Sequence, residues 1–347
     1  MRRALTLTAA AGAALLTRRA LRRRIRRSPL WPLPALEEPV SGHSPRRLLR
    51  TTVVARSEPA EGVVQLTLES PELPAWTPGA HVDVVLPSGL VRQYSLCGDP
   101  ADTGRYTLAI RRVEDGRGGS GEAHDRLVEG AVLRVRAPRN RFPLVAAPAY
   151  VFVAGGIGIT PILPMLRAAT AAGADWTLLY GGRSRASMPF LAELAAYGDR
   201  VTLVPEDEAG LPDLGPLAAA AGVPVYCCGP APLMDAVLAA APDPSAVHLE
   251  RFTPSAPGGG ERPFTIELRR SGGAVEVAAD ESALAAVRRA VPATPYSCGQ
   301  GFCGTCRHRV LEGEVDHRDD LLADAEREDS MLLCVSRAVS ERLVLDL

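Results

Sequence analysis

Four cysteines toward the carboxyl end of the chain have the types and spacing to bind a metal centre. Cys298, Cys303 and Cys306 form a C-x4-C-x2-C pattern, and Cys334 follows in a separate segment. Two irons need four converging thiolates, and one tight loop with a second, distant segment can supply them in the plant-type 2Fe–2S spacing. We therefore predict that these four cysteines bind a 2Fe–2S cluster.

The cysteine loop is also rich in glycine. Gly299, Gly301 and Gly304 permit positive φ angles, so the loop can curl and bring backbone N–H groups close to the sulfurs. Two alternatives remain at this stage, namely four buried structural cysteines or a zinc site. Zinc ligands usually come as two short C-x2–4-C pairs, whereas here three cysteines share one loop, which favours iron and sulfur.

A second pattern with chemical potential is the run Arg92-Gln93-Tyr94-Ser95. A guanidinium offers two-pronged contact to a phosphate, and an aromatic plane can support a planar ring. The segment Gly116-Arg117-Gly118-Gly119-Ser120 opens a short helical stretch, whose first N–H groups are free to bind an anion. A tyrosine on an edge strand more often simply packs, so the prediction depends on both segments together.

A third pattern, VFVAGGIGITP at 151–161, sets three glycines between a buried strand and a helix. Such a turn lets a pyrophosphate approach the backbone and points the helix N-terminus at it. It is not the G-x-G-x-x-G fingerprint, and a tight strand–helix turn also needs small residues. Two later strand ends, at 180–184 and 228–234, would lie on the same sheet edge, where ligands of open α/β folds bind.

Hydrophobic periodicity divides the chain into three modules. Six alternating segments (LLRTTVVAR, VVQLTLES, HVDVVLP, VRQYSL, RYTLAIRRV and VLRVRAP) predict a closed antiparallel barrel with a short helix at 121–127. Apolar strands then alternate with helical segments such as 161–172 and 188–198, which predicts a parallel sheet covered on both faces. A small β-rich unit surrounds the cysteines. The predicted boundaries are 1–44 (basic arm and linker), 45–147 (barrel), 148–252 (α/β domain), 253–261 (linker) and 262–347 (cysteine domain).

Composition excludes several classes of protein. The 347 residues are 46% hydrophobic and 23% charged with a net charge of −1, which is typical of a globular chain and not of a disordered or nucleic-acid-binding one. The first 30 residues carry nine arginines and no acid. This arm is interpreted as a disordered segment, a basic helix lying on anionic lipid, or an export signal. We predict a cytoplasmic monomer, with peripheral membrane contact through the arm left open and no nucleic-acid partner.

In this order, the three modules resemble the phthalate dioxygenase reductase family, which includes the reductase of vanillate demethylase. The resemblance covers about residues 45–347. It implies an antiparallel flavin-binding β-barrel, an α/β parallel-sheet NAD-binding domain and a C-terminal β-grasp ferredoxin domain. It also implies FMN rather than FAD. The flavin residues would be Arg92, Gln93, Tyr94, Ser95, Gly118, Gly119 and Ser120, with Phe252 of the Glu250-Arg251-Phe252 tripeptide shielding the ring.

The same resemblance implies the nucleotide site. Its residues would be Gly155, Gly156, Gly158, Thr160, Gly181, Arg183, Ser184, Asp207, Gly229 and Pro230. The catalytic residues would be Ser95, near flavin N5, and Cys228, beside the nicotinamide. Acidic residues at 206–208 would repel a 2′-phosphate, which favours NADH, with NADPH as the alternative.

The implied function is electron transfer from NADH through FMN and the 2Fe–2S cluster to a terminal oxygenase, with a Rieske-type oxygenase favoured. Two alternatives stay open, a reductase for a haem monooxygenase and a membrane-associated flavin and iron–sulfur redox sensor. The segment between Cys306 and Cys334 holds nine acids. We expect Asp319, Asp320 and Asp324 to attract a basic docking patch of the partner, unless the run is merely a solvated face.

Overall fold

The computed structural model describes residues 48–114, 118–252, 262–319 and 321–347. The predicted basic arm and linker at 1–44, the linker at 253–261, and Gly116, Arg117 and Asp320 lie outside the described residues. The described residues all belong to one compact unit of the chain.

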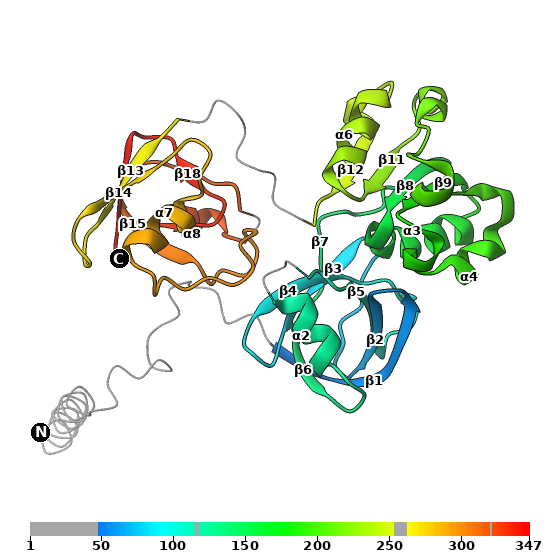
Figure 1. Cartoon of the computed structure of the whole chain (residues 1–347), viewed down its shortest axis with the longest axis horizontal. Helices are drawn as coiled ribbons and strands as arrows, with labels where there is room; N and C mark the ends of the chain where they lie inside the picture. Colours follow the sequence, from blue (N-terminus) through cyan, green and yellow to red (C-terminus); the bar gives the residue numbers. More distant parts are fainter. Residues whose placement is uncertain (1–47, 115–117, 253–261, 320) are drawn as a thin grey trace, which may run out of the picture. The chain divides into compact units, whose positions relative to one another are not determined.

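The first part of the described chain is an antiparallel barrel (Figure 1). Its sheet has the order β4-β3-β6-β1-β2-β5, with the short β7 (Arg139–Asn140) paired to β3. The strands are β1 (Leu48–Ala60), β2 (Val63–Glu69), β3 (Ala80–Val85), β4 (Val91–Ser95), β5 (Arg105–Arg111) and β6 (Val132–Arg136). A bridge between Leu96 and Leu108 joins the two ends of this order, and α2 (Gly119–Arg126) lies between β5 and β6. All six predicted strands are present.

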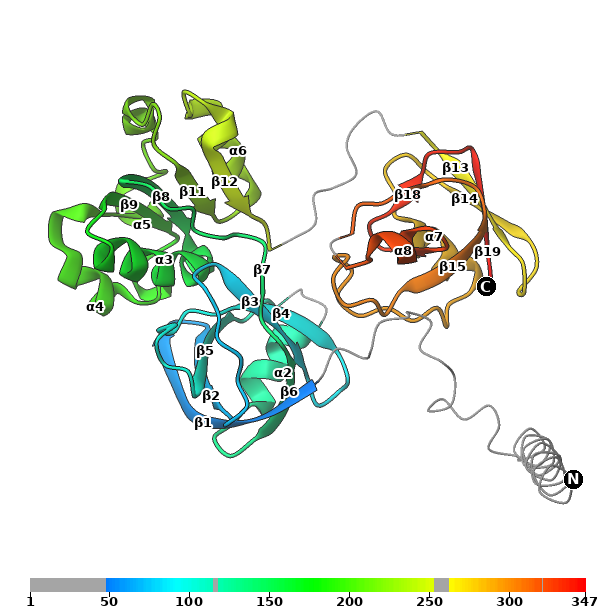
Figure 2. The ribbon, with the colours of Figure 1, turned by 180° about the vertical axis from the view of Figure 1, so that it is seen from behind.

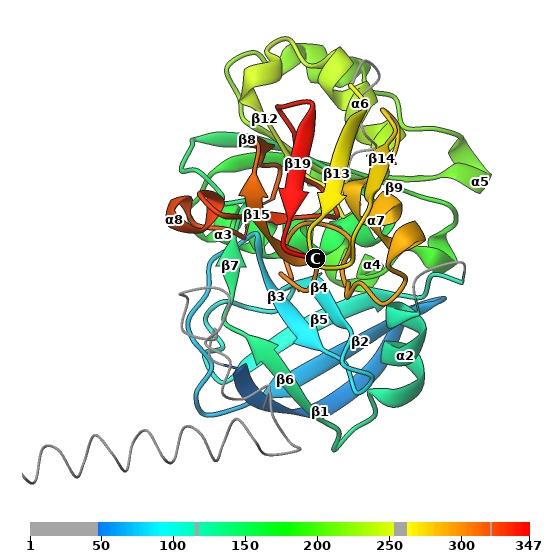
Figure 3. The ribbon, with the colours of Figure 1, turned by 90° about the vertical axis from the view of Figure 1, so that its left-hand side faces the viewer.

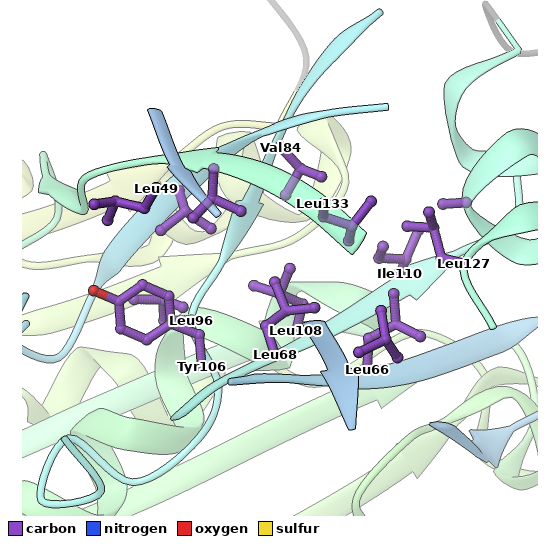
Figure 4. Packing of buried hydrophobic residues seen from close by; sticks show 14 of the residues in the cluster. Leu49, Leu66, Leu68, Val84, Leu96, Tyr106, Leu108, Ile110, Leu127 and Leu133 are labelled. Atoms are coloured by element: carbon purple, nitrogen blue, oxygen red, sulfur yellow. The ribbon is translucent and has the colours of Figure 1, made fainter. Parts of the chain in front are cut away.

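The barrel core follows from the alternation of apolar residues along these strands. Leu66 and Leu68 of β2, with Leu108 of β5, are fully buried and meet inside the barrel together with Leu133 of β6 (Figure 4). Each such side chain contributes about 1.5–3 kcal/mol when it is buried. The core therefore holds β3 in a defined position, and β3 in turn pairs with β4, which carries four of the candidate flavin residues.

The second part is a parallel sheet of five strands in the order β10-β9-β8-β11-β12. Its strands are β8 (Ala149–Gly155), β9 (Asp175–Gly182), β10 (Val201–Pro205), β11 (Val225–Cys228) and β12 (Val247–Glu250), and its helices are α3 (Ile159–Ala171), α4 (Leu191–Leu194), α5 (Glu206–Ala209) and α6 (Ala231–Ala240). Phe152 of β8 packs in the cluster that contains α3, whereas Val153 packs in the cluster that contains α6. The sheet is thus covered on both faces, and Figure 2 shows α3 against β8 and β9.

Two elements of this part differ from the sequence-based expectation. The helix expected at 188–198 is a single α-helical turn, because Phe190 starts it with φ 68° and Gly198, at φ 56°, interrupts the 3-10 turn that follows. β12 is an additional parallel strand beside β11. It places Glu250 at the same carboxyl edge as the glycine-rich turn after β8.

The third part is a mixed sheet of five strands in the order β14-β13-β19-β15-β17, of which the first four lie side by side in Figure 3. The elements are β13 (Phe264–Leu268), β14 (Ala274–Val277), α7 (Ala283–Ala290), β15 (Arg307–Glu312), β16 (Val315–Asp316), α8 (Asp324–Arg327), β17 (Ser330–Leu332), β18 (Arg337–Ala338) and β19 (Arg342–Leu345). β13 and β19 are parallel, and the other pairs are antiparallel. With these three parts the predicted fold class is confirmed, while the domain boundaries stay predictions. Within the described ranges, no helix is both long and apolar enough to cross a membrane.

Candidate functional site

The four cysteines of the predicted cluster site come together in the third part of the chain. Cys298, Cys303, Cys306 and Cys334 are all buried. The Cys298 thiol contacts those of Cys303 and Cys334, and the latter also contacts Cys306. Among the described residues, no group of three or more His, Cys, Asp or Glu side chains is arranged to hold a single metal ion. The four thiols form one contiguous group, and four converging sulfurs are what a two-iron centre requires.

Backbone N–H groups of the cysteine loop point at the sulfurs. Gln300 N lies 3.2 Å from Cys298 Sγ, and Gly301 N lies 3.3 Å from Cys334 Sγ. Gly301 adopts φ 80°, and a Cβ there would come within 2.8 Å of Val335 Cγ2, so the loop needs glycine at this position. Hydrogen bonds between the neighbouring thiols lower the pKa of Cys298 and raise that of Cys303. Four buried sulfurs lined by backbone N–H donors fit a 2Fe–2S cluster.

The candidate phosphate site lies where β4 meets the start of α2. A Cβ on Gly119 would lie 2.3 Å from Arg92 Nε, so only glycine lets this guanidinium lie against the first turn of the helix. Gly118, at φ 76°, leads the chain into that turn, and Ser120 Oγ accepts a hydrogen bond from Val113 N at 3.1 Å. A guanidinium beside the free N–H groups of a helix N-terminus suits a phosphate.

Tyr94 lies next to this site and carries an unsatisfied hydroxyl. The ring packs against the barrel core, and the hydroxyl is buried without a hydrogen-bond partner among the described residues. Burial raises the pKa of Tyr94, so the hydroxyl is protonated. Leaving such a group unpaired costs about 1–3 kcal/mol. A flavin at this place would supply the missing partner, so Arg92, Tyr94 and Gly119 together fit a bound flavin phosphate and ring.

Alternation along β4 separates the four residues of the Arg92–Ser95 run. Arg92 and Tyr94 share one face of the strand, and Gln93 and Ser95 share the other. The amide of Gln93 lies 3.5 Å from Asp83 Oδ1 on the neighbouring strand. Ser95 is buried and stands opposite His81 in the β3–β4 register. The assignment of Gln93 to the cofactor therefore stays a prediction, and its amide also has a partner within the protein.

The two predicted catalytic residues meet a pair of buried titratable side chains. Ser95 is hydrogen-bonded to Glu250, and burial raises the pKa of that carboxyl to about 8. His81 Nδ1 lies 3.9 Å from Glu250 Oε1, and burial, with the nearby Arg139 and Arg141 charges, lowers the pKa of His81 to about 3. The imidazole is therefore neutral at pH 7, and the carboxyl is largely protonated.

Cys228 lies at the end of β11 beside this group. Its thiol is fully buried, and burial, with the Glu250 carboxylate, raises its pKa well above the ordinary value. It is therefore a neutral, compact side chain and no nucleophile at neutral pH. Sequence reasoning missed His81, because one histidine in an alternating strand carries no signal of what covers it.

The glycines at the end of β8 and in the turn that follows it have two different roles. A Cβ on Gly158 would lie 2.1 Å from Cys228 O, and one on Gly155 would lie 2.6 Å from Pro230 Cδ. These two residues let the turn after β8 pack against the turn after β11. Gly156 has φ 53° and open space around its missing side chain. Of the three, Gly156 is the position where a ligand can approach the backbone.

The remaining predicted nucleotide residues lie at the same carboxyl edge of the parallel sheet. Several have partners within the protein: Thr160 Oγ1 donates to Ile157 O at 2.9 Å, Ser184 Oγ lies 3.3 Å from Ser187 Oγ, and a Cβ on Gly181 would lie 3.0 Å from Pro212 Cγ. Gly229 and Pro230 precede α6.

Three of the predicted cofactor-binding residues have exposed side chains. Arg183 and Asp207 are exposed, and Asp207 N donates to Arg183 O at 3.1 Å. Phe252 is also exposed, and its carbonyl accepts a hydrogen bond from Gln300 of the cysteine loop. The exposed pair after β9 and β10 is therefore free to meet a ligand at this edge.

The acidic segment before Cys334 differs from the expectation. Asp319 is buried and accepts hydrogen bonds from Leu321 N at 3.0 Å and Leu322 N at 2.7 Å. The expectation that Asp319 contributes to a docking surface is wrong, because its carboxylate holds the local backbone. Asp324 is exposed.

Comparison with known proteins identifies relatives over nearly all of the described chain. Residues 266–339 match the family described as "2Fe-2S iron-sulfur cluster binding domain". The phthalate 4,5-dioxygenase oxygenase reductase subunit of Pseudomonas putida is 40% identical over 85% of this chain and 95% of its own.

Two solved structures are also similar. The structure of phthalate dioxygenase reductase, described as modular for electron transfer from pyridine nucleotides to [2Fe-2S], is 37% identical with a TM-score of 0.64, covering 86% of this chain and 98% of its own. An intact type IV self-sufficient cytochrome P450 monooxygenase is 40% identical with a TM-score of 0.67. The match covers 92% of this chain but only 44% of that one.

Proposed function

This chain belongs to the phthalate dioxygenase reductase family of flavin and iron–sulfur oxidoreductases, and we propose that it carries electrons from NADH through FMN to a Rieske-type oxygenase. Electron transfer from a pyridine nucleotide to a 2Fe–2S centre on behalf of an oxygenase is the activity common to this family. For this chain, the flavin (FMN), the nucleotide (NADH) and the Rieske class of the oxygenase are what we propose. When bound, the flavin takes an electron pair from the nicotinamide and releases electrons singly to the cluster.

The observation that carries the proposal is the position of Arg92. Its side chain lies against Gly119 at the candidate phosphate site, and its Nη1 donates to Ser297 O at 3.1 Å. Ser297 directly precedes the first cysteine of the cluster loop. One guanidinium therefore adjoins both candidate cofactor sites, which supports a direct path for electrons between them.

The buried side chains at the carboxyl edge of the parallel sheet support the first step of the electron path, from the nicotinamide to the flavin. Ser95, Cys228 and Glu250 come from β4, β11 and the end of β12, so they join the barrel to the α/β domain where the nicotinamide would meet the flavin. We propose that Ser95 and Cys228 line this meeting point. Neutral Cys228 and largely protonated Glu250 keep it free of fixed charge, which excludes water and favours contact between two planar rings.

Acidic side chains after β10 support NADH over NADPH. Glu206, Asp207 and Glu208 follow the strand, where a ribose 2′-group of a bound dinucleotide is read in such folds. Arg185 Nε is paired to Glu208 Oε1 at 2.9 Å. We propose that these acids repel a 2′-phosphate. Measuring kcat/KM with each nucleotide tests this, and a preference for NADPH would refute it.

The Rieske class of partner is supported by the relatives that serve phthalate dioxygenases. A haem monooxygenase is the second candidate, because the self-sufficient cytochrome P450 contains a segment 40% identical to this chain. Coupled turnover with a purified phthalate-type oxygenase and with a separate P450 haem domain distinguishes the two. The monomeric state and the membrane contact stay predictions.

The experiment for the whole proposal is anaerobic mixing of the flavin-loaded, cluster-loaded protein with NADH. Flavin absorbance should bleach first, and the electron paramagnetic resonance signal of a reduced 2Fe–2S centre should follow. The Cys303→Ser variant should bleach without that signal, because serine replaces a soft thiolate with a harder oxygen. Absence of bleaching in the wild-type protein would overturn the proposal.

A further inference from the structure

The outer face of β3 is covered, although the alternation of a barrel strand would leave it in water. Val82 and Val84 point into the barrel core, so His81, Asp83 and Val85 point outward. The Asp83 side chain is nevertheless fully buried. Val85 packs against a small apolar cluster that includes residues of the cysteine loop. The face that carries Asp83 is therefore an internal interface of the protein.

The Asp83 side chain is paired with two arginines. Its Oδ1 lies 2.6 Å from Arg139 Nη2, and its Oδ2 lies 3.2 Å from Arg136 Nη1. A buried charge is tolerated only when it is paired and hydrogen-bonded, and these contacts meet that condition. These contacts orient the guanidinium of Arg136, because it pairs with a buried side chain that Arg139 also holds.

The same nitrogen of Arg136 reaches the cysteine loop. Nη1 donates to Cys303 O at 3.3 Å. The carbonyl belongs to the residue predicted as the second cluster ligand. A guanidinium has several donors in a fixed plane, so one arginine can bind a carboxylate and a carbonyl at once.

A second set of contacts joins the loop to the start of β4, before the bridge between Leu96 and Leu108 that closes the barrel. β4 is the terminal strand of the sheet order, and Val91 N donates outward to Ser297 Oγ at 2.7 Å. Val91 also packs against Cys298, Phe302 and Cys303. The loop therefore covers an edge that would otherwise expose backbone N–H groups.

We propose that Arg136, directed by Asp83, is a positioning residue that docks the cysteine loop on the flavin barrel and so controls electron delivery to the cluster. The part that concerns electrons rests on the proposed function. The docking itself does not, because it depends only on contacts within the chain. Loss of the Arg136 contact removes one of the hydrogen bonds that join the loop to the barrel and leaves those of Val91 and Arg92, so the undocked population of the loop rises.

The test compares Arg136→Ala with Arg134→Ala in the full-length, cofactor-loaded protein. Arg134 lies on the same strand, and its side chain is exposed, so it is a matched control for loss of a cation. Hydrogen exchange of the Val91 amide reports docking, since that N–H is covered by Ser297. Arg136→Ala loses a hydrogen bond from a charged group, so the exchange rate of the Val91 amide should rise by about tenfold or more. In Arg134→Ala the exchange rate of that amide should stay unchanged.

Electron transfer gives the second readout. In Arg136→Ala, reduction of the flavin by NADH should keep its wild-type rate, and subsequent reduction of the cluster should slow. Arg136→Lys should restore part of the rate, because lysine keeps the charge but offers a single point donor. If Arg136→Ala loses the cluster, Asp83→Asn provides the same test by removing the group that directs the arginine.

Unchanged Val91 exchange in both Arg136→Ala and Asp83→Asn would overturn the docking role. An equal change in Arg134→Ala would also overturn it, by assigning the effect to net charge. If the wild-type cluster is not reduced after flavin bleaching, the proposed function fails, and the exchange data still decide the docking role. Faster exchange with an unaltered rate of cluster reduction would overturn control of electron delivery by Arg136.

Discussion

Gly119→Ala is the sharpest test of the candidate flavin phosphate site. A Cβ at position 119 would lie 2.3 Å from Nε and 2.8 Å from Cγ of Arg92, whereas carbon atoms in contact stay about 3.5–4.0 Å apart. The guanidinium must therefore move away from the first turn of α2. It would lose its place beside the helix N-terminus, and its contact with Ser297 O would be disturbed.

The magnitude follows from the bond that is lost. A hydrogen bond to a charged group contributes about 1.5–3 kcal/mol, which corresponds to about 10- to 150-fold in a dissociation constant. We expect Gly119→Ala to bind FMN more weakly by that factor. The assay is a titration of flavin-free protein with FMN, in which quenching of the flavin fluorescence measures binding.

Two controls make the result specific. Gly121 lies in the same helix with nothing within 4 Å of the added Cβ, so Gly121→Ala should bind FMN normally and gain about 0.4–1 kcal/mol of stability. Riboflavin lacks the phosphate, so its weaker binding should be the same in wild type and Gly119→Ala. Normal FMN affinity in Gly119→Ala, or an equal loss for riboflavin, would refute the assignment of the phosphate to Arg92.

Three further predictions follow from other parts of the site. Cys303→Ser should lose NADH-driven reduction of one-electron acceptors such as cytochrome c while flavin bleaching continues; undiminished cytochrome c reduction would remove Cys303 from the path. Burial raises the pKa of Glu250 to about 8 and lowers that of His81 to about 3. Just below pH 6.5 the two groups change the free energy of unfolding with pH in opposite directions, whereas above pH 6.5 only Glu250 still changes it. Chemical denaturation should therefore show the free energy of unfolding falling by about 1–2 kcal/mol as pH rises from about 6.5 to 8, and Glu250→Gln should abolish this fall. Asp319→Asn should lower stability by about 1–3 kcal/mol, because a buried acceptor of two backbone N–H groups is weakened, whereas Asp324→Asn should leave the melting temperature unchanged; equal melting curves for the two variants would contradict this.

Local patterns in the sequence were sufficient for the cluster loop and for the three parts of the fold. Cysteine spacing and loop glycines are properties of one short segment, so the convergence of Cys298, Cys303 and Cys306 follows from the segment itself. Strand alternation likewise identified all six main barrel strands, since one face of each must be apolar to form the core. The glycine-rich turn after β8 could also be predicted, because its glycines lie within one short segment.

Other features depended on which elements cover one another in the folded chain. Asp319 belongs to an acidic run that is typical of a solvated face, yet the backbone folds over it. Gly155 and Gly158 were assigned to a ligand, but the turn after β11 is what leaves no room for a side chain there. The sequence around Asp319, Gly155 and Gly158 does not predict either of these contacts.

The outer face of β3 shows the difference most clearly. Alternation in HVDVV marks Val82 and Val84 as core residues and says nothing about what lies on the opposite side. Only the tertiary structure brings Glu250 to His81 and joins Asp83 to Cys303 through Arg136. The partners are separated from β3 by more than fifty residues in the case of Arg136 and by far more for Cys303. A period-2 pattern records the burial of the face that forms its own core, whereas burial of the other face depends on distant segments that the pattern does not include.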